Sequence, residues 1–598
     1  MTHRLSLDSP SRTEPVTDRR PFLGSSAAPV RPVLTLNVEQ ASPRFSWALG
    51  LVLVTALAAC VRLWQLDLHR LWLDEGFVAV AALRSPGHLW LDLPRIEPHP
   101  PLFFLIEHWW TSVAGLGIIA LRLPSALAAT LSVPLGVFLL RRWIGPFASI
   151  VAGLGIALNP LLVWYAQEAR MYSLLGLELL ASIYLLDRAF TAPRGKRAFS
   201  FLLISLVLEA AALYTHYLGS LVPIAQLLVL LARRPAPPWL SKSWLVGQVL
   251  LLASWLPWLV FWGVLASPGV RSEEALRPLD AGVLVARLLS FGSAFPTEDP
   301  LNSWVPTLVA LAALGALVSM FVRRARNRGL LAVELVSGLG FLVALYFAVV
   351  AGSYTGKALV LFVPIILGLM AAPLAQPSRF RAPLTVVLLL GLVGPEVAGL
   401  AAYFDTDRYA KWYSYEAAAE AVQRHLGADD LLLEADLDPS FRYYAGLPGP
   451  PVAALILPHA VEGQDEVLWT ERPAQPGGKI AAWSWSPRFE TVSAEIAAVG
   501  ATYDNVWFAL NPTTSWWDTR GAAREELRRQ LWARERIPPA MPPSSASSLP
   551  AASPDPIRSR RQPVSARSSF LAQVACSRQM GAPRSASPGC PWPSPPDP

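Results

Sequence analysis

The sequence reads WLDEG over Trp72–Gly76, an adjacent pair of carboxylates that follows the first long apolar run. That run, Phe45–Trp64, is long enough to cross a bilayer, since about 20 apolar residues, each rising ~1.5 Å, span ~30 Å of hydrocarbon. Its one charge, Arg62, lies near the end of the run, where we expect the side chain to reach the membrane interface. Two acids so close to lipid are costly unless they pair, coordinate or react, so Asp74 and Glu75 indicate a functional site.

The composition is that of a membrane protein. Of 598 residues, 53% are hydrophobic and 16% are charged, whereas a soluble protein has roughly 25% charged residues. The net charge of +7 comes mostly from short loops between apolar runs, which is typical of membrane topology and not of a nucleic-acid-binding face. The cysteines Cys60, Cys576 and Cys590 are too scattered for a disulfide framework or a Cys-based metal site. The polar, Arg-rich residues 1–44 predict a disordered cytoplasmic tail with no cleavable signal peptide.

Loop charges predict the orientation of the spans in the plasma membrane. With residues 1–44 in the cytoplasm, every inside loop is basic, as at Arg141–Arg142, and this follows the positive-inside rule. The assignment requires that Pro101–Gly115 does not cross. That segment is short and has Glu107 and His108 in its middle, so we predict an amphipathic helix in the outer interface. The sequence thus predicts a polytopic α-helical membrane protein with about 11 transmembrane helices, at 45–64, 121–140, 146–165, 171–187, 199–217, 219–232, 244–264, 304–322, 332–351, 358–375 and 383–403.

This topology places acidic, basic and imidazole side chains on the outer face. Taken singly, each has an ordinary explanation: Glu168 and Arg170 could form an interfacial ion pair, and Lys357 could anchor the end of a span. Such independent explanations do not predict that all of these groups share one face. We therefore predict a single outer site, made of Asp74, Glu75, His99, Glu168, Arg170, His216 and Lys357, with Tyr172 in the same cluster as Arg170.

Carboxylates and fixed cations at a membrane surface suit transfer of a sugar from a lipid-linked phosphosugar. A carboxylate near the anomeric carbon can take the proton of the attacking hydroxyl, and cations can offset the charge on the departing phosphate. The sequence has no Gly-rich phosphate loop, so a soluble nucleotide sugar is not the expected donor. Paired acids also occur in glycosidases, but those enzymes rarely need so many spans. A multi-span transporter or flippase for a lipid-linked sugar stays open, and it would place its charges at mid-span. No cofactor is expected, and a divalent metal requirement stays open.

Six strings carry a resemblance to a known family. They are RLWLDEGF at 70–77, EPHPPLFFLIEHWW at 97–110, LRLPSALAATLSVPLGVFLLRRW at 121–143, LNPLLVWYAQEARMYSLL at 158–175, YTHY at 214–217, and YTGK at 354–357 followed by Pro364. As a set they resemble the GT-C fold glycosyltransferases over residues 45–404, and in particular the bacterial multi-span branch of the protein mannosyltransferase and aminoarabinose transferase superfamily. The resemblance implies an inverting transfer from a polyprenyl-phosphate sugar to a hydroxyl of a protein, lipid or polysaccharide, with Asp74 as the base.

The residues of the predicted site divide into three roles. We expect Asp74 to be the catalytic base and Glu75 to be its orienting or acceptor-binding partner. Arg170 and Lys357 are expected to bind the donor phosphate; many relatives carry Arg where this chain has Lys357, and Lys binds phosphate as a point charge, not as a planar fork. The remaining side chains are expected to bind substrate: His99, Glu168, Tyr172 and His216.

After residue 404 the composition becomes that of a small extracytoplasmic α/β domain, predicted over 405–535. The pattern predicts a helix near Tyr415–Leu426, strands at Leu431–Leu433, Val452–Leu457 and near Val506–Phe508, and a charged helix over Arg520–Arg536. The Pro- and Ser-rich residues 536–598 are predicted to be disordered.

Overall fold

The structure is a computed structural model of the full chain. It describes residues 43–91, 99–265, 276–310 apart from 303 and 308, 328–350, 354–375, 379, 381–406, parts of 409–424, 430–434 and 439–444, and three further strands at 505–510, 532–537 and 572–577. The chain divides into two units, Met1–Ser46 and Trp47–Pro598. Of the first unit only the opening residues of helix α1 are described, so the following paragraphs concern the second.

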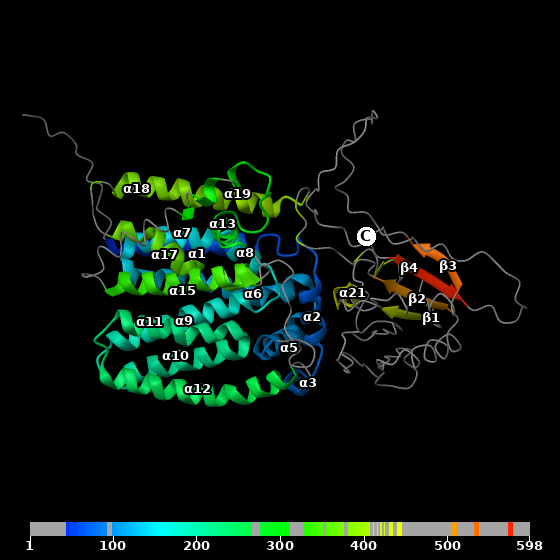
Figure 1. Cartoon of the computed structure of the whole chain (residues 1–598), viewed down its shortest axis with the longest axis horizontal. Coiled ribbons are helices and arrows are strands. Elements are labelled where there is room, and N and C mark those ends of the chain that lie inside the picture. The colour runs from blue at the N-terminus through cyan, green and yellow to red at the C-terminus, as the bar shows by residue number, and fades with distance from the viewer. Residues whose placement is uncertain are drawn as a thin grey trace, which may run out of the picture. The chain divides into compact units, whose positions relative to one another are not determined.

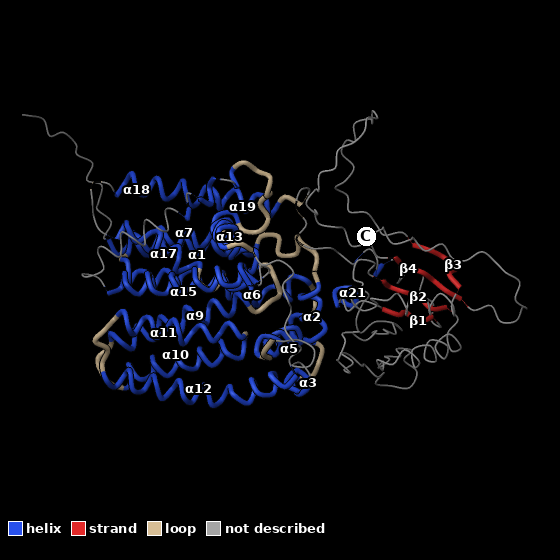
Figure 2. The backbone as a smooth tube through the Cα atoms, in the orientation of Figure 1, coloured by secondary structure: helices blue, strands red, loops and turns tan. Residues whose placement is uncertain are grey.

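Long apolar helices run side by side in a bundle (Figures 1 and 2). Among the described residues, six helices are long and apolar enough to cross a membrane, and the bent pair α7–α8 makes a seventh span if it is counted as one. The membrane character predicted from composition is therefore confirmed. The bundle comprises α1 (Pro43–Leu63), α6 (Ile118–Ile144), α7 (Pro146–Leu158), α8 (Pro160–Ala166), α9 (Tyr172–Thr191), α10 (Lys196–Thr215), η1 (Tyr217–Ser220), α11 (Leu221–Ala232), α12 (Pro238–Leu265), α13 (Pro278–Phe291), α15 (Arg328–Val350), α16 (Thr355–Leu359), α17 (Val363–Ala371), η4 (Ala372–Ala375), α18 (Arg381–Leu388), the π-turn Leu389–Val393, and α19 (Gly394–Phe404).

Most described residues of the predicted spans are helical, apart from the ends of some spans and breaks such as those at Asn159 and 360–362, and most of 304–322 lies outside the described residues. Three kinds of departure from a straight apolar span occur. Helix α9 contains three charged residues, α11 and α17 are short, and the predicted span 146–165 is bent by 55°. The count of 11 transmembrane helices therefore stays a prediction.

The bend between α7 and α8 is built by Asn159 and Pro160. Pro160 opens α8, and the Asn159 side chain caps it. The break leaves carbonyl groups at the end of α7 without helical partners. Arg62 supplies the donors: its guanidinium donates to Ile156 O and Ala157 O, both at 2.8 Å, and the side chain is fully buried. The prediction that Arg62 reaches the membrane interface is therefore wrong, because the freed carbonyl groups hold it inside the bundle.

Three short helices gather at one end of the bundle (Figure 1). They are α2 (Leu73–Ala82), α3 (Pro86–Leu91) and α5 (Leu102–Ala114). Helices α2 and α5 pack together, with the rings of Phe77 and Phe104 edge to face at 5.8 Å. Helix α5 has 13 residues and is not among the helices that could span a membrane. Its predicted place in the outer interface stays a prediction.

A buried acid ties three helices together near the far end of α9. Asp187 pairs with Arg142 of α6 and with Arg233, which follows α11. Arg142 lies in the last turn of α6, within the Arg141–Arg142 segment that the sequence predicts to be cytoplasmic, and Arg233 is the C-cap residue of α11. Asp187 lies 17 residues beyond Arg170, so about 25 Å of helix separates this basic end from the predicted site. Which of the two ends faces the cytoplasm stays a prediction.

The apolar core lies between α6, α7, α9, α15 and α17, whose buried apolar side chains form one cluster. The close contact between α15 and the start of α17 depends on a glycine. A side chain at Gly340 in α15 would collide with the Phe362 ring, so glycine lets α15 approach the start of α17. This packing fixes the position of α16, which carries Lys357.

The strands after the bundle form a four-stranded sheet in the order β1-β2-β4-β3. The parallel pair is β1 (Asp430–Glu434) and β2 (Asn505–Leu510), while β4 (Ala572–Ser577) runs antiparallel to β2 and to β3 (Trp532–Ile537). Strands β1 and β2 coincide with predicted strands, and the predicted strand at 452–457 lies outside the described residues. Two strands correct the prediction: β3 replaces the end of the helix predicted over 520–536, and β4 lies in the tail predicted to be disordered. In both, cross-strand pairing overrides local composition. The α/β domain and the domain boundaries stay predictions.

Candidate active site

Asp74 lies in the first turn of α2, between two cations. Its Oδ2 atom is 3.6 Å from Arg170 Nη2 and 3.7 Å from Lys357 Nζ, and Arg170 Nη1 also donates to the Asp74 carbonyl at 3.4 Å. Arg170 comes from the turn before α9, and Lys357 comes from α16. The Asp74 side chain is 18% exposed and Arg170 is buried. Three residues distant in sequence thus form one charged cluster, as the topology predicted.

Glu75, the neighbour of Asp74, is buried in a different environment. Arg122 of α6 donates to both of its carboxylate oxygens at 2.8 Å, and the Ala169 backbone N–H donates to Oε1 at 2.8 Å. Burial alone would raise the pKa of Glu75, but the charge and hydrogen bonds of Arg122 outweigh it and hold that pKa below its usual value. With both oxygens engaged and no exposed surface, Glu75 fastens α2 to α6 and to the turn that holds Arg170.

Arg122 also fixes the loop that precedes α2. Besides Glu75, its guanidinium donates to the carbonyl groups of Leu66, His69 and Arg70 at 2.9, 2.8 and 3.3 Å. The side chain is 1% exposed. All donor groups that point into the loop are thereby used, so the position of the α2 N-terminus depends on this one buried side chain.

Glu168 and Arg170, which could have paired with each other, have separate partners. Glu168 accepts a hydrogen bond from Trp72 Nε1 at 3.0 Å, and its Oε2 lies 3.4 Å from Lys411 Nζ. Glu168 and Lys411 are both buried. Burial raises the pKa of Glu168, and the Lys411 charge opposes that rise.

Aromatic and imidazole rings form the third part of the site. The ring of His216 lies 4.8 Å from that of His99 and 5.4 Å from that of Tyr172, while Lys357 Nζ is 5.5 Å from the Tyr172 ring centre. The backbone N–H of Leu218 donates to His216 Nδ1 at 2.9 Å, so in the neutral ring the proton lies on Nε2. Neither His216 Nε2 nor the Tyr172 hydroxyl has a hydrogen-bond partner among the described residues. Both atoms are buried polar groups whose hydrogen-bonding capacity is unused among those residues.

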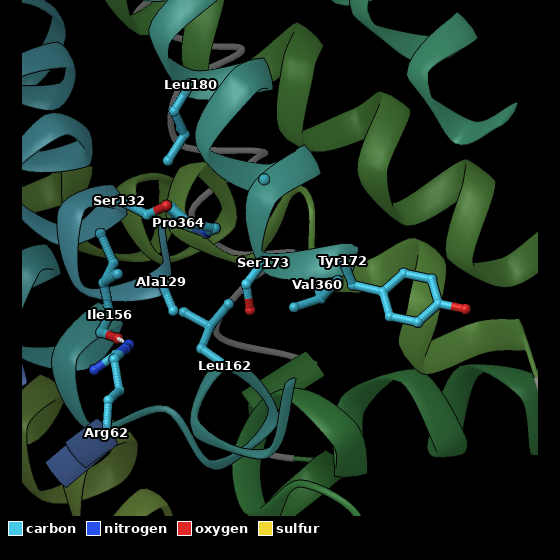
Figure 3. A pocket seen from close by; sticks show the side chains of 11 residues that line it. Arg62, Ala129, Ser132, Ile156, Leu162, Tyr172, Ser173, Leu180, Val360 and Pro364 are labelled. Carbon is cyan, nitrogen blue, oxygen red and sulfur yellow. Dashed lines mark hydrogen bonds between the residues drawn. The ribbon is translucent and has the colours of Figure 1, made fainter. Parts of the chain in front are cut away.

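A small cavity of about 20 Å³ lies between α6, α8, α9 and the start of α17 (Figure 3). Its lining is mainly apolar, and Arg62 and Tyr172 lie on opposite sides of it. The Arg62 guanidinium donates to backbone carbonyl groups, while its Nε has no hydrogen-bond partner among the described residues. Within the described residues, no group of three His, Cys, Asp or Glu side chains could hold a metal ion.

All eight residues predicted for the site are therefore brought together at one end of the helical bundle, which the sequence predicts to be the outer end. Sequence reasoning missed Arg122, Lys411 and Trp72. A signal existed for Arg122, which lies in the LRLPS string of the resemblance, and for Trp72, which adjoins the acidic pair. Lys411 lies after the last predicted span and offers no such signal.

Comparisons with known proteins agree with this architecture. The family model described as Dolichyl-phosphate-mannose-protein mannosyltransferase matches residues 98–261. Among solved structures, the chain is similar to ArnT from Cupriavidus metallidurans in the apo state, with 14% identity and a TM-score of 0.54, over 82% of this chain and 96% of that one. The same ArnT bound to undecaprenyl phosphate matches with 14% identity and a TM-score of 0.49, over 79% and 94%. No curated protein sequence matches the chain significantly.

A more distant likeness extends to the archaeal oligosaccharyltransferase AglB from Archaeoglobus fulgidus, in complex with an inhibitory peptide and a dolichol-phosphate. That match has 11% identity and a TM-score of 0.44, over 68% of this chain and 60% of that one. The chain has the GT-C fold of membrane glycosyltransferases, and the resemblance found in the sequence is confirmed.

Proposed function

We propose that the chain is a glycosyltransferase that moves a sugar from a polyprenyl-phosphate donor to a hydroxyl acceptor on the outer face of the membrane. The observation that carries the proposal is the partly exposed Asp74 carboxylate with two cations at 3.6 and 3.7 Å. A base and fixed cations in one small site match the two charges that move in such a transfer, the acceptor proton and the negative charge of the departing phosphate. The GT-C fold, and a matching family whose description names a dolichyl-phosphate sugar, support this class.

In the proposed step, the anomeric carbon is inverted. The acceptor hydroxyl gives its proton to the Asp74 carboxylate as its oxygen attacks the anomeric carbon, on the face opposite the phosphate. The bond from that carbon to the phosphate oxygen breaks, and its electron pair leaves with the polyprenyl phosphate. The added negative charge develops beside Arg170 and Lys357, where fixed cations stabilise it most strongly. Asp74 then loses the proton to water.

The distances from Asp74 Oδ2 to Arg170 and Lys357 can be compared with those that the transfer requires. A phosphate oxygen that accepts from the far side of Arg170 or Lys357 at ~2.8 Å would lie about 6–7 Å from Asp74 Oδ2. In-line attack needs ~2.6–3.2 Å from base to attacking oxygen and ~3–3.5 Å from that oxygen to the carbon. The second length ends at the anomeric carbon, and the phosphate oxygens lie at least one bond beyond it, so the donor phosphate would approach the cations from the side away from Asp74.

The other residues of the predicted site take supporting roles. We assign the His216 Nε2–H and the Tyr172 hydroxyl to hydroxyl groups of the sugar, with His99 stacked beside them. We assign Glu75 and Glu168 to positioning, because protein partners engage both oxygens of each carboxylate.

Transport or flipping of a lipid-linked sugar is the competing function. A transporter places its binding groups near the midplane on broken helices. In this chain the charged cluster lies at helix ends: Asp74 at the start of α2, Arg170 before α9, and Lys357 in the short helix α16. The bent pair α7–α8 does interrupt the bundle, but the Arg62 guanidinium there is engaged by backbone carbonyl groups. The placement of charge favours the enzyme.

The test is a transfer assay with the purified full chain in lipid vesicles. A panel of radiolabelled polyprenyl-phosphate sugars is incubated with the protein, and sugar leaving the lipid-soluble fraction is counted. We expect turnover of at least one donor by the parent protein and by Asp280→Asn, a matched control at an exposed carboxylate on α13. If no donor on the panel loses its sugar while vesicle flotation shows intact incorporation, the proposed function is wrong.

A further inference from the structure

Lys411, in the region after the last helix of the bundle, lies beside the carboxylate of Glu168 in the site. Lys411 follows the end of α19 by seven residues, and its side chain has no exposed surface. Burying an ammonium group without partners costs free energy, so the groups around Lys411 indicate its role. Its Nζ lies 3.2 Å from Trp164 O, 3.4 Å from Gln167 O and 3.4 Å from Glu168 Oε2. The ammonium thus donates hydrogen bonds to two carbonyl groups and forms an ion pair with Glu168, whose Oε2 has no hydrogen-bond partner among the described residues.

The two carbonyl groups belong to the C-terminal end of α8. Carbonyl groups in the last turn of a helix lack intrahelical partners, and a cation there interacts favourably with the helix dipole. The ammonium also lies 4.7 Å from the centre of the Trp164 ring. Lys411 therefore caps α8 at the point where the chain turns toward Glu168 and Arg170.

The ion pair with Glu168 connects Lys411 to the segment that carries Asp74. Glu168 holds Trp72 through the indole N–H, and Trp72 is the N-cap residue of α2, two positions before Asp74. A chain of contacts therefore runs from Lys411 through Glu168 and Trp72 to the first turn of α2. The Asp74 backbone is held from the other side by Arg170, so this chain completes its positioning.

Other described residues after α19 contact the loop that precedes α2. The Tyr409 ring packs against the rings of Trp164 at 5.7 Å and His69 at 5.8 Å, and Arg70 pairs with Glu416 at 2.9 Å. Further along, the Leu71 N–H donates to the Tyr444 hydroxyl at 2.8 Å in the short helix α21 (Pro439–Tyr444). Within residues 409–444, which we call the strap, the described residues Tyr409, Glu416 and Tyr444 therefore contact the loop before α2.

We infer that Lys411 is a positioning residue of the active site, so that the strap, and not the helical bundle alone, completes the site that holds Asp74. The expected effect of Lys411 on turnover rests on the proposed sugar transfer. Its role in positioning α2 does not. The catalytic domain predicted over 45–404 then lacks the segment that carries Lys411 and should extend beyond residue 404. Truncation after residue 404 would remove the cap of α8 and leave Glu168 buried without its cation.

The first test measures hydrogen exchange of the backbone amides at the start of α2 in the full chain. The Gly76 N–H, which donates to Trp72 O at 2.8 Å, reports the first turn. Lys411→Met removes the charge and keeps the apolar stem, and the exposed Lys196→Met is the matched control. We expect Lys411→Met to speed exchange at Gly76 about tenfold or more, which corresponds to about 1.4 kcal/mol. Exchange equal to that of the control overturns the inference, whether or not sugar transfer is observed.

The second test follows turnover and its pH dependence. Lys411→Met is expected to lower kcat roughly 10- to 100-fold, since a misplacement of about 1 Å has effects of that size, and to change the donor KM little. Glu168 faces Lys411, Glu75, Asp74 and Lys357. Removing Lys411 raises the pKa of Glu168 further, so the acid limb of the rate profile should move to higher pH, and Lys411→Arg should restore it.

The double variant Lys411→Met/Glu168→Gln keeps the inference testable if the single variant does not fold, because neither charge is then left alone in the interior. We expect its loss of turnover to be no larger than that of Lys411→Met, since both substitutions break the same chain of contacts. A folded double variant with the turnover of the parent overturns the inference. Absence of transfer by the parent itself would instead count against the proposed function.

Discussion

Breaking the buried pair of Glu75 and Arg122 should destabilise the protein strongly. Glu75→Ala leaves the Arg122 guanidinium buried at 1% exposure without a countercharge. Removing one partner of such a pair costs about 3–5 kcal/mol of the free energy of unfolding. The exposed pair of Arg70 and Glu416, with side chains 51% and 31% exposed, is the internal control. Glu416→Gln should cost at most about 1 kcal/mol.

Arg122→Met should cost more than Glu75→Ala, because it removes more than a charge. It also frees the carbonyl groups of Leu66, His69 and Arg70, each of which is about 1–3 kcal/mol unfavourable when buried without a donor. The double variant leaves no unpaired charge but still frees those carbonyl groups. It should therefore be more stable than the sum of the single losses predicts, and less stable than the parent.

The assay is reversible unfolding of each variant in mixed micelles, with a denaturing detergent as the titrant and helical circular dichroism as the signal. Turnover measured on the same preparations separates loss of fold from loss of chemistry. A Glu75→Ala variant within 1 kcal/mol of the parent would refute a structural role for the pair. A double variant as stable as the parent would refute the contribution of the three carbonyl contacts.

Three further predictions concern the phosphate site, the topology and pH. Lys357→Met should weaken donor binding about 10- to 150-fold, because one charge-assisted contact contributes about 1.5–3 kcal/mol, whereas Lys357→Arg should bind as well or better; equal transfer by Lys357→Met at limiting donor would reduce Lys357 to a membrane anchor. Single cysteines introduced at Arg84 and Arg141, with the native cysteines removed, should react with a membrane-impermeant reagent on intact cells only at position 84, and outside labelling at 141 would contradict the eleven-span topology. Burial raises the pKa of Glu107 in α5, and neither of its oxygens has a partner among the described residues. The stability that depends on its neutral form should be complete below the unfolded pKa of about 4.3 and fall as pH rises through the raised native pKa, and Glu107→Gln should flatten that fall in pH-dependent thermal unfolding.

Much of the bundle could be predicted from the sequence, because a membrane imposes simple constraints of length and polarity. Apolar runs of about 20 residues must form helices whose backbone groups pair internally. Basic loops then fix which ends of the helices lie together. That reasoning alone predicted that Asp74, Arg170 and Lys357 lie together, although they are far apart in the chain. In the structure the side chains of Arg170 and Lys357 both lie within 4 Å of Asp74 Oδ2.

Pairing within the site could not be predicted, because a charge pattern does not choose partners. Glu168 could have paired with its neighbour Arg170, yet its cation is Lys411, more than 240 residues away. Arg62 was expected at the interface because its position near a helix end permits it, but the carbonyl groups at the bend of α7 bind it inside. The Asn159-Pro160 step that makes this bend is visible in the sequence, while its consequence for Arg62 depends on tertiary packing.

The central claim, that Asp74 is the base of a polyprenyl-phosphate-dependent sugar transfer, is tested most directly by the single-turnover rate of Asp74→Asn with a donor that the parent uses. The substitution keeps the shape of the side chain and removes its basicity. The account predicts a rate lower by roughly 10²–10⁴-fold, with the donor still bound. A folded Asp74→Asn protein that transfers sugar at close to the parent rate would contradict it.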